Sequence, residues 1–184
     1  MQKIVIAITG ASGVIYAKRL LDKLFGVSNI EVHIVVSENA KQVISSELSD
    51  FRLSSYNFKV WENNDFDAPF ASGSARFGSM VVCPCSMASL SRIANGAATD
   101  LITRAADVML KERGRLIIVP REMPFNLIHI RNMESATLAG AIICPAMPSF
   151  YSCPQTIDEL ADTVVNRILD LLCVANDGFS WGKV

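Results

Sequence analysis

Short apolar segments that alternate with amphipathic helical segments constrain the fold of this chain more than any other feature. Strands are predicted at residues 3–8, 30–36, 80–83, 116–119 and 141–144, with a short edge strand near 57–61. Helices are predicted over residues 14–25, 38–48, 86–95, 99–113 and 156–174. Strands that are apolar throughout are typical of parallel sheets that helices cover on both faces. The sequence therefore predicts a doubly wound, Rossmann-like, three-layer α/β fold.

Three of the predicted strands run directly into a proline, at Pro84, Pro120 and Pro145. Because proline has no N–H to give to a strand ladder, each of these residues is expected to end its strand. No linker or repeat divides the chain, so residues 1–184 are expected to form one domain, with a C-terminal helix and tail from about residue 156. Such sheets bind ligands at the carboxyl ends of their strands, so the informative residues should follow the strands.

The composition is apolar and nearly neutral. Of the 184 residues, 19% are charged, and the net charge is −1 with histidine neutral. Average soluble domains carry about 25% charged residues, so this composition fits a large core, surfaces buried between subunits, or both. Near-neutrality gives no basic stripe for nucleic acid. No apolar stretch approaches the roughly 18 residues that span a membrane, and the N-terminal run is too short for a signal peptide. A cytoplasmic protein is expected.

The cysteine count argues against a disulfide framework and against a metal site. Five cysteines are present, an odd number, in apolar surroundings. Cys83 and Cys85 are separated by a single residue, and only His33 and His129 could complete a metal site with them. Zinc sites usually contain more closely spaced ligand pairs. We therefore expect no metal.

A glycine-containing turn, Gly10-Ala11-Ser12-Gly13, follows the first predicted strand. Glycine allows a tight turn, and the free N–H groups of the helix that follows can bind an anion. A simple turn into a helix explains the same residues. In a dinucleotide-binding fingerprint a third glycine packs the helix against the strand, but that position here is Tyr16. None of the three tyrosines has a lysine four residues later, so a short-chain NAD-dependent dehydrogenase is not favoured.

Serines follow the second and third predicted strands. Ser37 is either a phosphate ligand or the N-cap of the next helix. Ser86 and Ser89 lie at another predicted helix N-terminus, where two hydroxyl groups could form a second anion-binding turn opposite the first. Either serine could also be an ordinary capping residue. Three turns with hydroxyl groups at one sheet edge favour a phosphate-bearing ligand.

Several basic residues are candidates for binding an anion. Arg104 and Lys111 are seven residues apart and share a helix face with Asp107, which also suits a surface ion ladder. Arg121 and Tyr151 lie near strand ends and together indicate an anionic ligand. Arg167 lies at the edge of the apolar stripe of the last helix, where it either extends to solvent or reaches a buried anion. His33 lies inside an apolar strand and is interpreted as a core residue.

Six segments of the chain resemble one protein family. They are ITGASGVIYAKRLL, VHIVVSENA, PFASGS, VVCPCSMASLSRIANG, LITRAADVMLKERGRLIIVPREMPFNLIHIRNM and GAIICPAMPSFYSCPQTIDEL. These segments cover most of residues 6–170 in order. The chain is thus similar to the UbiX-type flavin prenyltransferases, within the wider group of homo-oligomeric flavin-containing cysteine decarboxylase folds. The resemblance implies a Rossmann-like fold of the flavoprotein type.

The resemblance also implies a set of site residues. FMN-binding positions are Gly10, Ala11, Ser12, Ser37, Ser86, Met87, Ala88, Ser89 and Arg121. Positions around a dimethylallyl phosphate are Arg104, Lys111, Glu122, Tyr151 and Arg167. The implied catalytic residues are Ser12, beside the reactive flavin nitrogen, Glu47, Lys111, and Glu122 as the proton carrier. Phe66 stands where some members of the family have tryptophan, at a wall of the prenyl pocket.

The reaction that the resemblance implies is a metal-independent transfer of the dimethylallyl group from dimethylallyl monophosphate to reduced FMN. The product, prenylated FMN, would serve a partner decarboxylase of the UbiD type. The family's pocket forms between subunits, commonly of a dodecamer. Two alternatives are an FMN-dependent decarboxylase of cysteine-type substrates and a flavin carrier protein. A carrier would explain the turns but would leave Lys111, Glu122, Tyr151 and Arg167 without a purpose.

Overall fold

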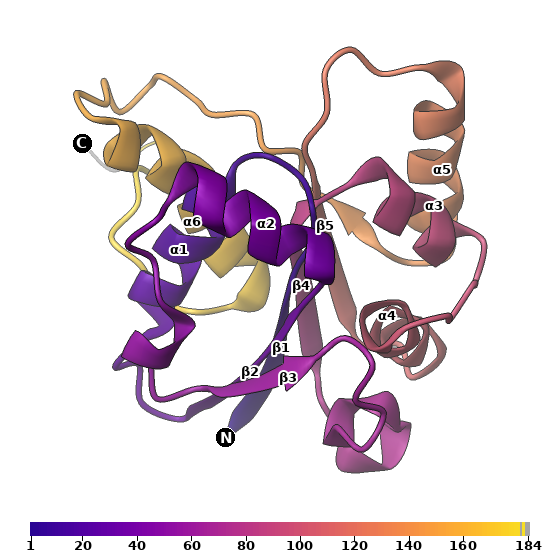
Figure 1. Cartoon of the computed structure of the whole chain (residues 1–184). Helices are drawn as coiled ribbons and strands as arrows, with labels where there is room; N and C mark the ends of the chain where they lie inside the picture. Colours follow the sequence, from indigo (N-terminus) through magenta and orange to yellow (C-terminus); the bar gives the residue numbers. More distant parts are fainter. Residues whose placement is uncertain (181, 183–184) are drawn as a thin grey trace.

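The computed structural model describes residues 1–180 and residue 182 of the chain. Within this part, six parallel strands form one sheet in the order β3-β2-β1-β4-β5-β6. Their bounds are β1 Gln2–Ile8, β2 Ile30–Val36, β3 Lys59–Glu62, β4 Ser79–Cys85, β5 Arg115–Pro120 and β6 Ile142–Ile143. Strands β1, β4 and β5 run upward in Figure 1, so their carboxyl ends lie at the top edge of the sheet.

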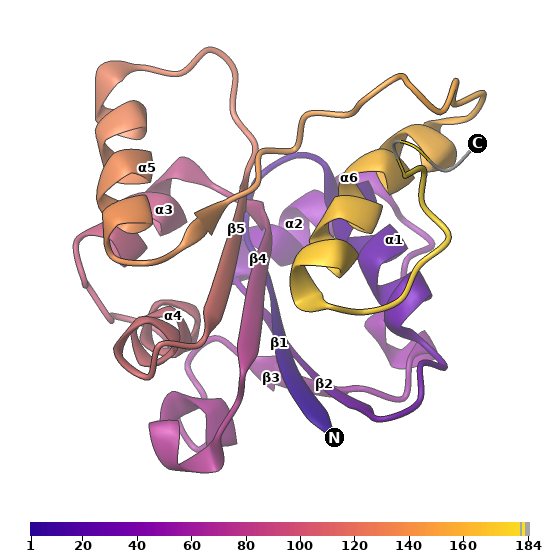
Figure 2. The same ribbon diagram turned by 180° about the vertical axis from the view of Figure 1, so that it is seen from behind.

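Helices cover both faces of the sheet. They are α1 Val14–Leu24, α2 Glu38–Glu47, α3 Met87–Ala94, α4 Leu101–Lys111, α5 Leu127–Leu138 and α6 Ile157–Leu172. Helices α1, α2 and α6 pack on one face, and α3, α4 and α5 pack on the other (Figures 1 and 2). Along β1, Ile4 and Ile6 enter the first core cluster, whereas Val5 and Ala7 enter the second. Both faces of the strand are buried, which explains its uninterrupted apolar sequence. The predicted doubly wound, three-layer fold is confirmed.

The direction of winding reverses between β1 and β4. From β1 the chain continues outward to β2 and β3, whereas from β4 it continues outward to β5 and β6. The connections that leave β1 and β4 therefore pass to opposite faces of the sheet. A crevice at the carboxyl ends of two such strands is the usual ligand site of a doubly wound fold. The turns at residues 10–13 and 86–89 lie at this position.

The expectation that Pro84 ends its strand is wrong, because β4 continues through Pro84 to Cys85. Pro120 is the last residue of β5, so that strand does end at its proline. The pairing register shifts between Val82 and Cys85, so Pro84 lies in an irregularity where its missing N–H is not required. Pro145 does follow a strand, but β6 is shorter than the predicted 141–144.

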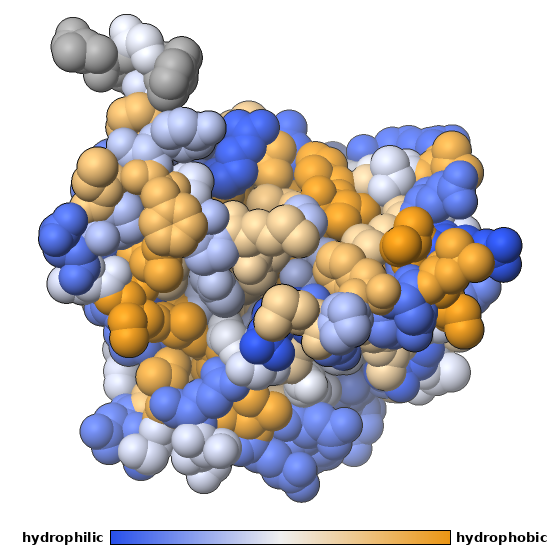
Figure 3. Space-filling view, turned by 90° about the horizontal axis from the view of Figure 1, so that it is seen from above, coloured by the Kyte–Doolittle hydropathy of each residue, from blue (hydrophilic) through white to orange (hydrophobic). Residues whose placement is uncertain are grey.

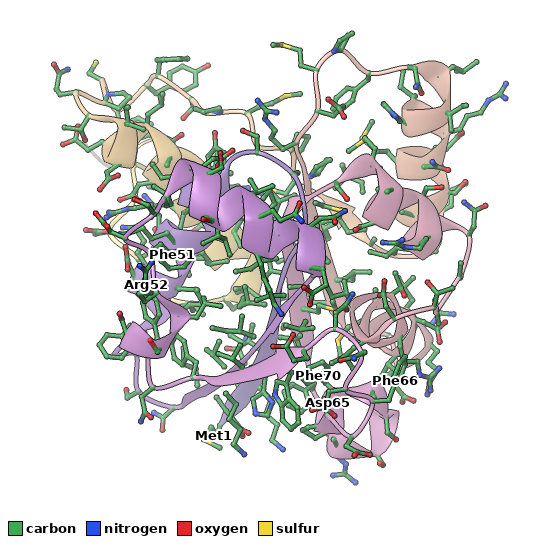
Figure 4. The ribbon with its side chains drawn as sticks, viewed as in Figure 1. Met1, Phe51, Arg52, Asp65, Phe66 and Phe70 are labelled. Atoms are coloured by element: carbon green, nitrogen blue, oxygen red, sulfur yellow. The ribbon has the colours of Figure 1, made fainter. Side chains whose placement is uncertain are left out.

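The segment after β3 contains more structure than the loop that the sequence predicts. It forms two short 3-10 turns, η2 at Pro69–Ala71 and η3 at Gly73–Ala75, and the Phe70 side chain is fully buried. Figure 4 labels Phe66 and Phe70 in this segment, close to α4. Turns of three residues have no hydrophobic periodicity, which explains why a pattern-based reading misses them.

The chain returns along α6 after that helix ends. Val174 N–H donates to the Leu169 carbonyl (2.9 Å), and Asp177 forms an ion pair with Lys23 of α1 (3.1 Å). The predicted tail extends to residue 184, of which residues 181, 183 and 184 lie outside the described part. None of the helices described is both long and apolar enough to cross a membrane.

Candidate functional site

The turn after β1 depends on two glycines for different reasons. Gly13 has a φ of 99°, in the left-handed region that side chains disfavour. At Gly10 a Cβ atom would lie only 2.5 Å from Cβ of Asn39 in α2, so there is no space for a side chain at this position. Ala11 is buried, whereas Ser12 is exposed at the tip of the turn. The turn thus lies against α2 and presents Ser12 to solvent.

Glu47, the last residue of α2, also binds this turn. Its carboxylate accepts the N–H groups of Gly13 (2.9 Å) and Val14 (2.9 Å), at the N-terminus of α1. Burial alone would raise the pKa of Glu47. Hydrogen bonds from Ser12 and from these two N–H groups, together with the charge of Arg121, hold its pKa below the ordinary value. Glu47 therefore fixes the turn as an anion and contacts the Ser12 hydroxyl.

Thr9 connects the first turn with the second, and sequence reasoning missed it. Its hydroxyl donates to the Pro84 carbonyl (2.8 Å) and accepts the Ser86 N–H (2.8 Å). Its own N–H also donates to the Pro84 carbonyl (3.3 Å). Thr9 is almost fully buried. A hydroxyl residue between an apolar strand and a glycine turn marks Thr9 as a candidate in the sequence, but its partners at Pro84 and Ser86 are visible only in the fold.

The second turn is capped by its own serines. The Ser86 hydroxyl accepts the Ser89 N–H (3.3 Å) and lies 3.1 Å from the Ser89 hydroxyl. Met87 and Ser89 are buried, whereas Ser86 and Ala88 are more accessible. The predicted turn 86–89 thus presents Ser86 and Ala88 outward, at the N-terminus of α3.

Ser37 is the N-cap of α2, as one of the two interpretations predicts. Its hydroxyl accepts the Ala40 N–H (3.2 Å), and its own N–H donates to the Ile8 carbonyl (3.0 Å). A hydroxyl that accepts a capping bond still has a proton to donate, so the cap leaves a role as phosphate ligand open. Ser37 follows β2, which lies beside β1 in the sheet.

Arg121 follows β5 and lies beside the first turn. Its N–H donates to the Cys85 carbonyl (3.2 Å), and its Cγ lies 3.8 Å from the position that a Cβ on Gly13 would take. Burial raises the pKa of Tyr16, and the Arg121 charge opposes this rise. The neighbouring Glu122 is exposed, and its carboxylate accepts the Met123 N–H (3.0 Å).

Tyr151 and Arg167 line one cavity of about 540 Å³ between the 144–154 segment, α6 and the C-terminal tail. The Tyr151 ring is stacked on Phe179, with centroids 6.4 Å apart. Arg167 lies 3.8 Å from Asp170, and both side chains are largely exposed. Burial raises the pKa of Cys144 in this cavity, and the positive charge of Arg167 opposes the rise.

Arg104 and Lys111 lie on α4, at the opposite flank of the molecule from α6 (Figures 1 and 2). Arg104 Nε donates to the Ala71 carbonyl (3.1 Å), and its Nη1 donates to Asp107 (2.9 Å). Lys111 forms an ion pair with Glu112. One chain therefore does not bring these two cations together with Tyr151 and Arg167. The sequence pattern predicts an ion pair between Arg104 and Asp107 as one alternative, and the structure contains this ion pair.

Apolar side chains are exposed on both sides of this carboxyl edge. Figure 3 looks down on the edge and shows apolar groups on each flank. The largest of these side chains are Met123, Leu127, Ile128, Met147, Phe150 and Tyr151, all more than half exposed. Large exposed apolar side chains that gather at one edge are typical of surfaces that other subunits or ligands cover. Among the described residues, no group of His, Cys, Asp or Glu could hold a metal ion.

Comparisons with known proteins identify the family. Residues 1–169 match the Flavoprotein family. The flavin prenyltransferase UbiX of Methanocaldococcus jannaschii is 48% identical over 99% of this chain and 100% of its own length. The chain belongs to the UbiX family of flavin prenyltransferases. The alternative of a cysteine-type decarboxylase is not favoured.

Solved UbiX structures agree with this assignment. A dodecameric FMN-dependent UbiX-like decarboxylase from Escherichia coli O157:H7 superposes with a TM-score of 0.92 at 37% identity, over 97% of this chain and 99% of that one. AnUbiX in complex with FMN and dimethylallyl pyrophosphate gives a TM-score of 0.86 at 41% identity, over 97% and 99% of the two chains. The predicted flavoprotein fold is thus that of UbiX proteins.

Proposed function

We propose that this protein transfers the dimethylallyl group of dimethylallyl monophosphate to reduced FMN and releases prenylated FMN. Membership of the UbiX family, at 48% identity over essentially the whole of both chains, is the observation that carries the proposal. The AnUbiX complex with FMN and dimethylallyl pyrophosphate supports both ligand classes, a flavin and an allylic phosphate ester.

The residues at the carboxyl edge fit FMN. Three helix N-termini, those of α1, α2 and α3, meet beside β1 and β4. Those of α2 and α3 begin with a serine hydroxyl, whereas Glu47 binds the first N–H groups of α1 and leaves Ser12 exposed beside them. The lack of a side chain at Gly10 lets the turn approach α2 closely. We assign FMN binding to the predicted set, in which Ser37 holds the phosphate and Ser12 and Arg121 lie near the ring. When bound, reduced FMN supplies the nucleophilic atoms that accept the prenyl group.

Loss of phosphate from an allylic ester builds negative charge on the leaving group. Arg104, Lys111 and Arg167 supply fixed positive charge, and an arginine can bind phosphate through two N–H groups. The Tyr151 hydroxyl adds a hydrogen bond. Because Arg104 and Lys111 lie on α4 and Arg167 on α6, we propose that neighbouring subunits complete each phosphate site. A homo-oligomer, of dodecameric size by analogy with the E. coli protein, meets this need.

Proton transfer and positioning fall to two glutamates. Glu122, directly after Arg121, is the proposed proton carrier, since its carboxylate is exposed and bonded only to the Met123 N–H among the contacts described. Glu47 acts on Ser12 through their hydrogen bond and on the turn through two N–H groups. Lys111 assists departure of the phosphate.

The fate of the product and the location of the protein complete the proposed function. A UbiD-type decarboxylase would use the product, consistent with the family's name. We propose a cytoplasmic location, which the five free cysteines support, since such thiols persist in a reducing compartment. We also interpret residues 1–184 as one flavin-binding domain.

Anaerobic incubation with reduced FMN and dimethylallyl monophosphate tests the function. Mass spectrometry of the extracted flavin should show the mass of one added prenyl group. Unmodified flavin, with binding of both ligands confirmed, would contradict the proposal and leave a carrier role. Carbon dioxide released from a cysteine-ended peptide, without flavin modification, would point instead to a decarboxylase.

The Glu122→Gln variant tests the proton carrier within that assay. Glutamine keeps the shape of the side chain and cannot carry a proton, so FMN should stay bound while adduct formation slows by about 10²-fold or more. Turnover at the wild-type rate would remove Glu122 from the mechanism. The Glu134→Gln variant, on the exposed surface of α5, is the matched control.

A further inference from the structure

His33 lies away from the proposed ligand sites, in a cluster of four rings. Its side chain is 1% exposed. The ring centroids of Phe77, Trp61 and Phe70 lie 4.9, 5.8 and 5.9 Å from that of the imidazole. The cluster lies on the face of the sheet that α4 covers. The reaction proposed above assigns nothing to these residues.

Hydrogen bonds fix the tautomer of His33. Trp61 Nε1–H donates to Nδ1 (3.1 Å), so Nδ1 carries no proton. Nε2 then carries the proton and donates to the Glu31 carboxylate (2.8 Å). The result is a continuous chain from Trp61 through His33 to Glu31, with every polar atom of the imidazole satisfied. Burial lowers the pKa of His33, and the bond to Glu31 opposes this shift.

Two of the rings around His33, those of Trp61 and Phe70, belong to segment 61–71, which contacts Arg104. Phe70 is the fully buried middle residue of η2, and the next residue, Ala71, accepts the hydrogen bond from Arg104 Nε (3.1 Å). The same segment holds the start of α4. Asn63 accepts the N–H groups of Leu101 (2.8 Å) and Ile102 (3.0 Å), through its carbonyl and side-chain oxygens.

We propose that His33 is a positioning residue, which acts with Trp61 and Glu31 to hold segment 61–71 and thereby aims Arg104 at the substrate phosphate. This inference rests on the proposed function. Arginine side chains are flexible, so a guanidinium with one N–H fixed by a backbone carbonyl loses less freedom when it binds a phosphate. A histidine that served only core packing would affect stability without affecting any ligand selectively.

The Trp61→Phe variant tests the inference, because it keeps an aromatic ring and removes the N–H donor. The KM for dimethylallyl monophosphate should rise about three- to tenfold, the scale of one lost hydrogen bond. The affinity for FMN and kcat should change less than twofold. The matched control is Tyr56→Phe, which also removes one aromatic hydrogen-bond donor. The Tyr56 hydroxyl donates to Asp22 (2.5 Å), and its ring packs against the core on the opposite face of the sheet from His33. The KM of this control variant should match the wild type.

Substitutions at Glu31 provide a second test, since the side chain of this residue is partly exposed. Glu31→Gln keeps an oxygen that accepts the imidazole N–H, so KM should stay within twofold of wild type. Glu31→Leu removes the acceptor, and KM should rise as for Trp61→Phe. Folded Trp61→Phe and Glu31→Leu variants with wild-type KM would overturn the positioning role alone. A wild-type protein that forms no prenylated FMN would overturn both the proposed function and this inference.

Discussion

At the scale of single residues, the close approach of Gly10 to α2 predicts a large effect from one methyl group. An alanine at residue 10 would place its Cβ 2.5 Å from that of Asn39. Overpacking of this kind costs about 1–3 kcal/mol and would push the turn away from α2. We expect Gly10→Ala to weaken FMN binding, measured by quenching of flavin fluorescence, and to lower the melting temperature.

A second substitution separates crowding from other effects at Gly10. Asn39→Gly removes the atom that Gly10→Ala would contact, so the double variant should recover part of the lost FMN affinity. Recovery will be incomplete because Asn39 backbone atoms also lie within 3.5 Å of the new methyl group. Equal losses in the single and double variants would show that steric contact with Asn39 is not the cause.

The lowered pKa of Glu47 predicts that the free energy of unfolding depends on pH. Its pKa is lowered in the folded protein from an ordinary value of 4.5, so the unfolded chain binds its proton more readily. The stabilisation from Glu47 is therefore complete above pH 4.5 and is lost as the pH falls through the folded pKa. Glu47→Gln should lower the free energy of unfolding at about pH 7 by about 1 kcal/mol, a modest value because the side chain is exposed.

Urea unfolding across this pH range measures the effect. The difference between wild type and Glu47→Gln should shrink as the pH falls below 4.5. Glu38→Gln is a control in the same helix, because the Glu38 carboxylate pairs with Lys41 at the surface and not with the turn. A constant difference at all pH values would contradict the assignment of Glu47 as the anion that binds this turn.

At the scale of the helices, Ser37 allows a cap to be distinguished from a ligand. Ser37→Ala removes an N-cap, which costs about 1 kcal/mol of stability. Thr156→Ala removes the N-cap of α6, whose hydroxyl accepts the Glu159 N–H (3.1 Å), at a similar cost. If Ser37 also binds the FMN phosphate, only Ser37→Ala should raise the Kd for FMN, by about tenfold. Titration calorimetry with FMN measures the Kd of each variant. Equal Kd values for the two variants would show that Ser37 serves only as an N-cap.

At the scale of helices and strands, a feature could be predicted from the sequence where its cause lies in neighbouring residues of the chain. The apolar strands and the striped helix α6 were predictable because burial on one or two faces leaves a period in the sequence. Strand β4 was predicted to stop at Pro84, since only the register shift beside β5 shows why a proline fits there. The glycine turn was predictable as a turn, but Thr9 as its link to Ser86 was not, because that contact joins residues 77 positions apart.

At the scale of the whole molecule, the candidate site residues fall into separate groups. Ser12, Ser86 and Arg121 gather at the carboxyl edge, whereas Arg104 lies on α4 and Arg167 on α6. Helix α5 is exposed along most of its length, with Leu127, Ile128 and Leu138 all more than half accessible. The low fraction of charged residues had anticipated surfaces buried between chains. Which residues meet across them depends on the assembly, and a single chain does not contain that information.

Mixed assemblies test whether the phosphate site is shared. Arg104→Ala and Tyr151→Phe should each impair prenyl transfer, because each removes a proposed phosphate ligand from every site. When the two variants are co-expressed in equal amounts, sites that take Arg104 from one subunit and Tyr151 from another will sometimes receive both native residues. Random mixing predicts about a quarter of wild-type activity. If the two residues served a site within the same chain, no mixed site would be intact, and activity would stay at the level of the single variants. Rates of prenylated FMN formation by the purified mixed oligomers distinguish these outcomes.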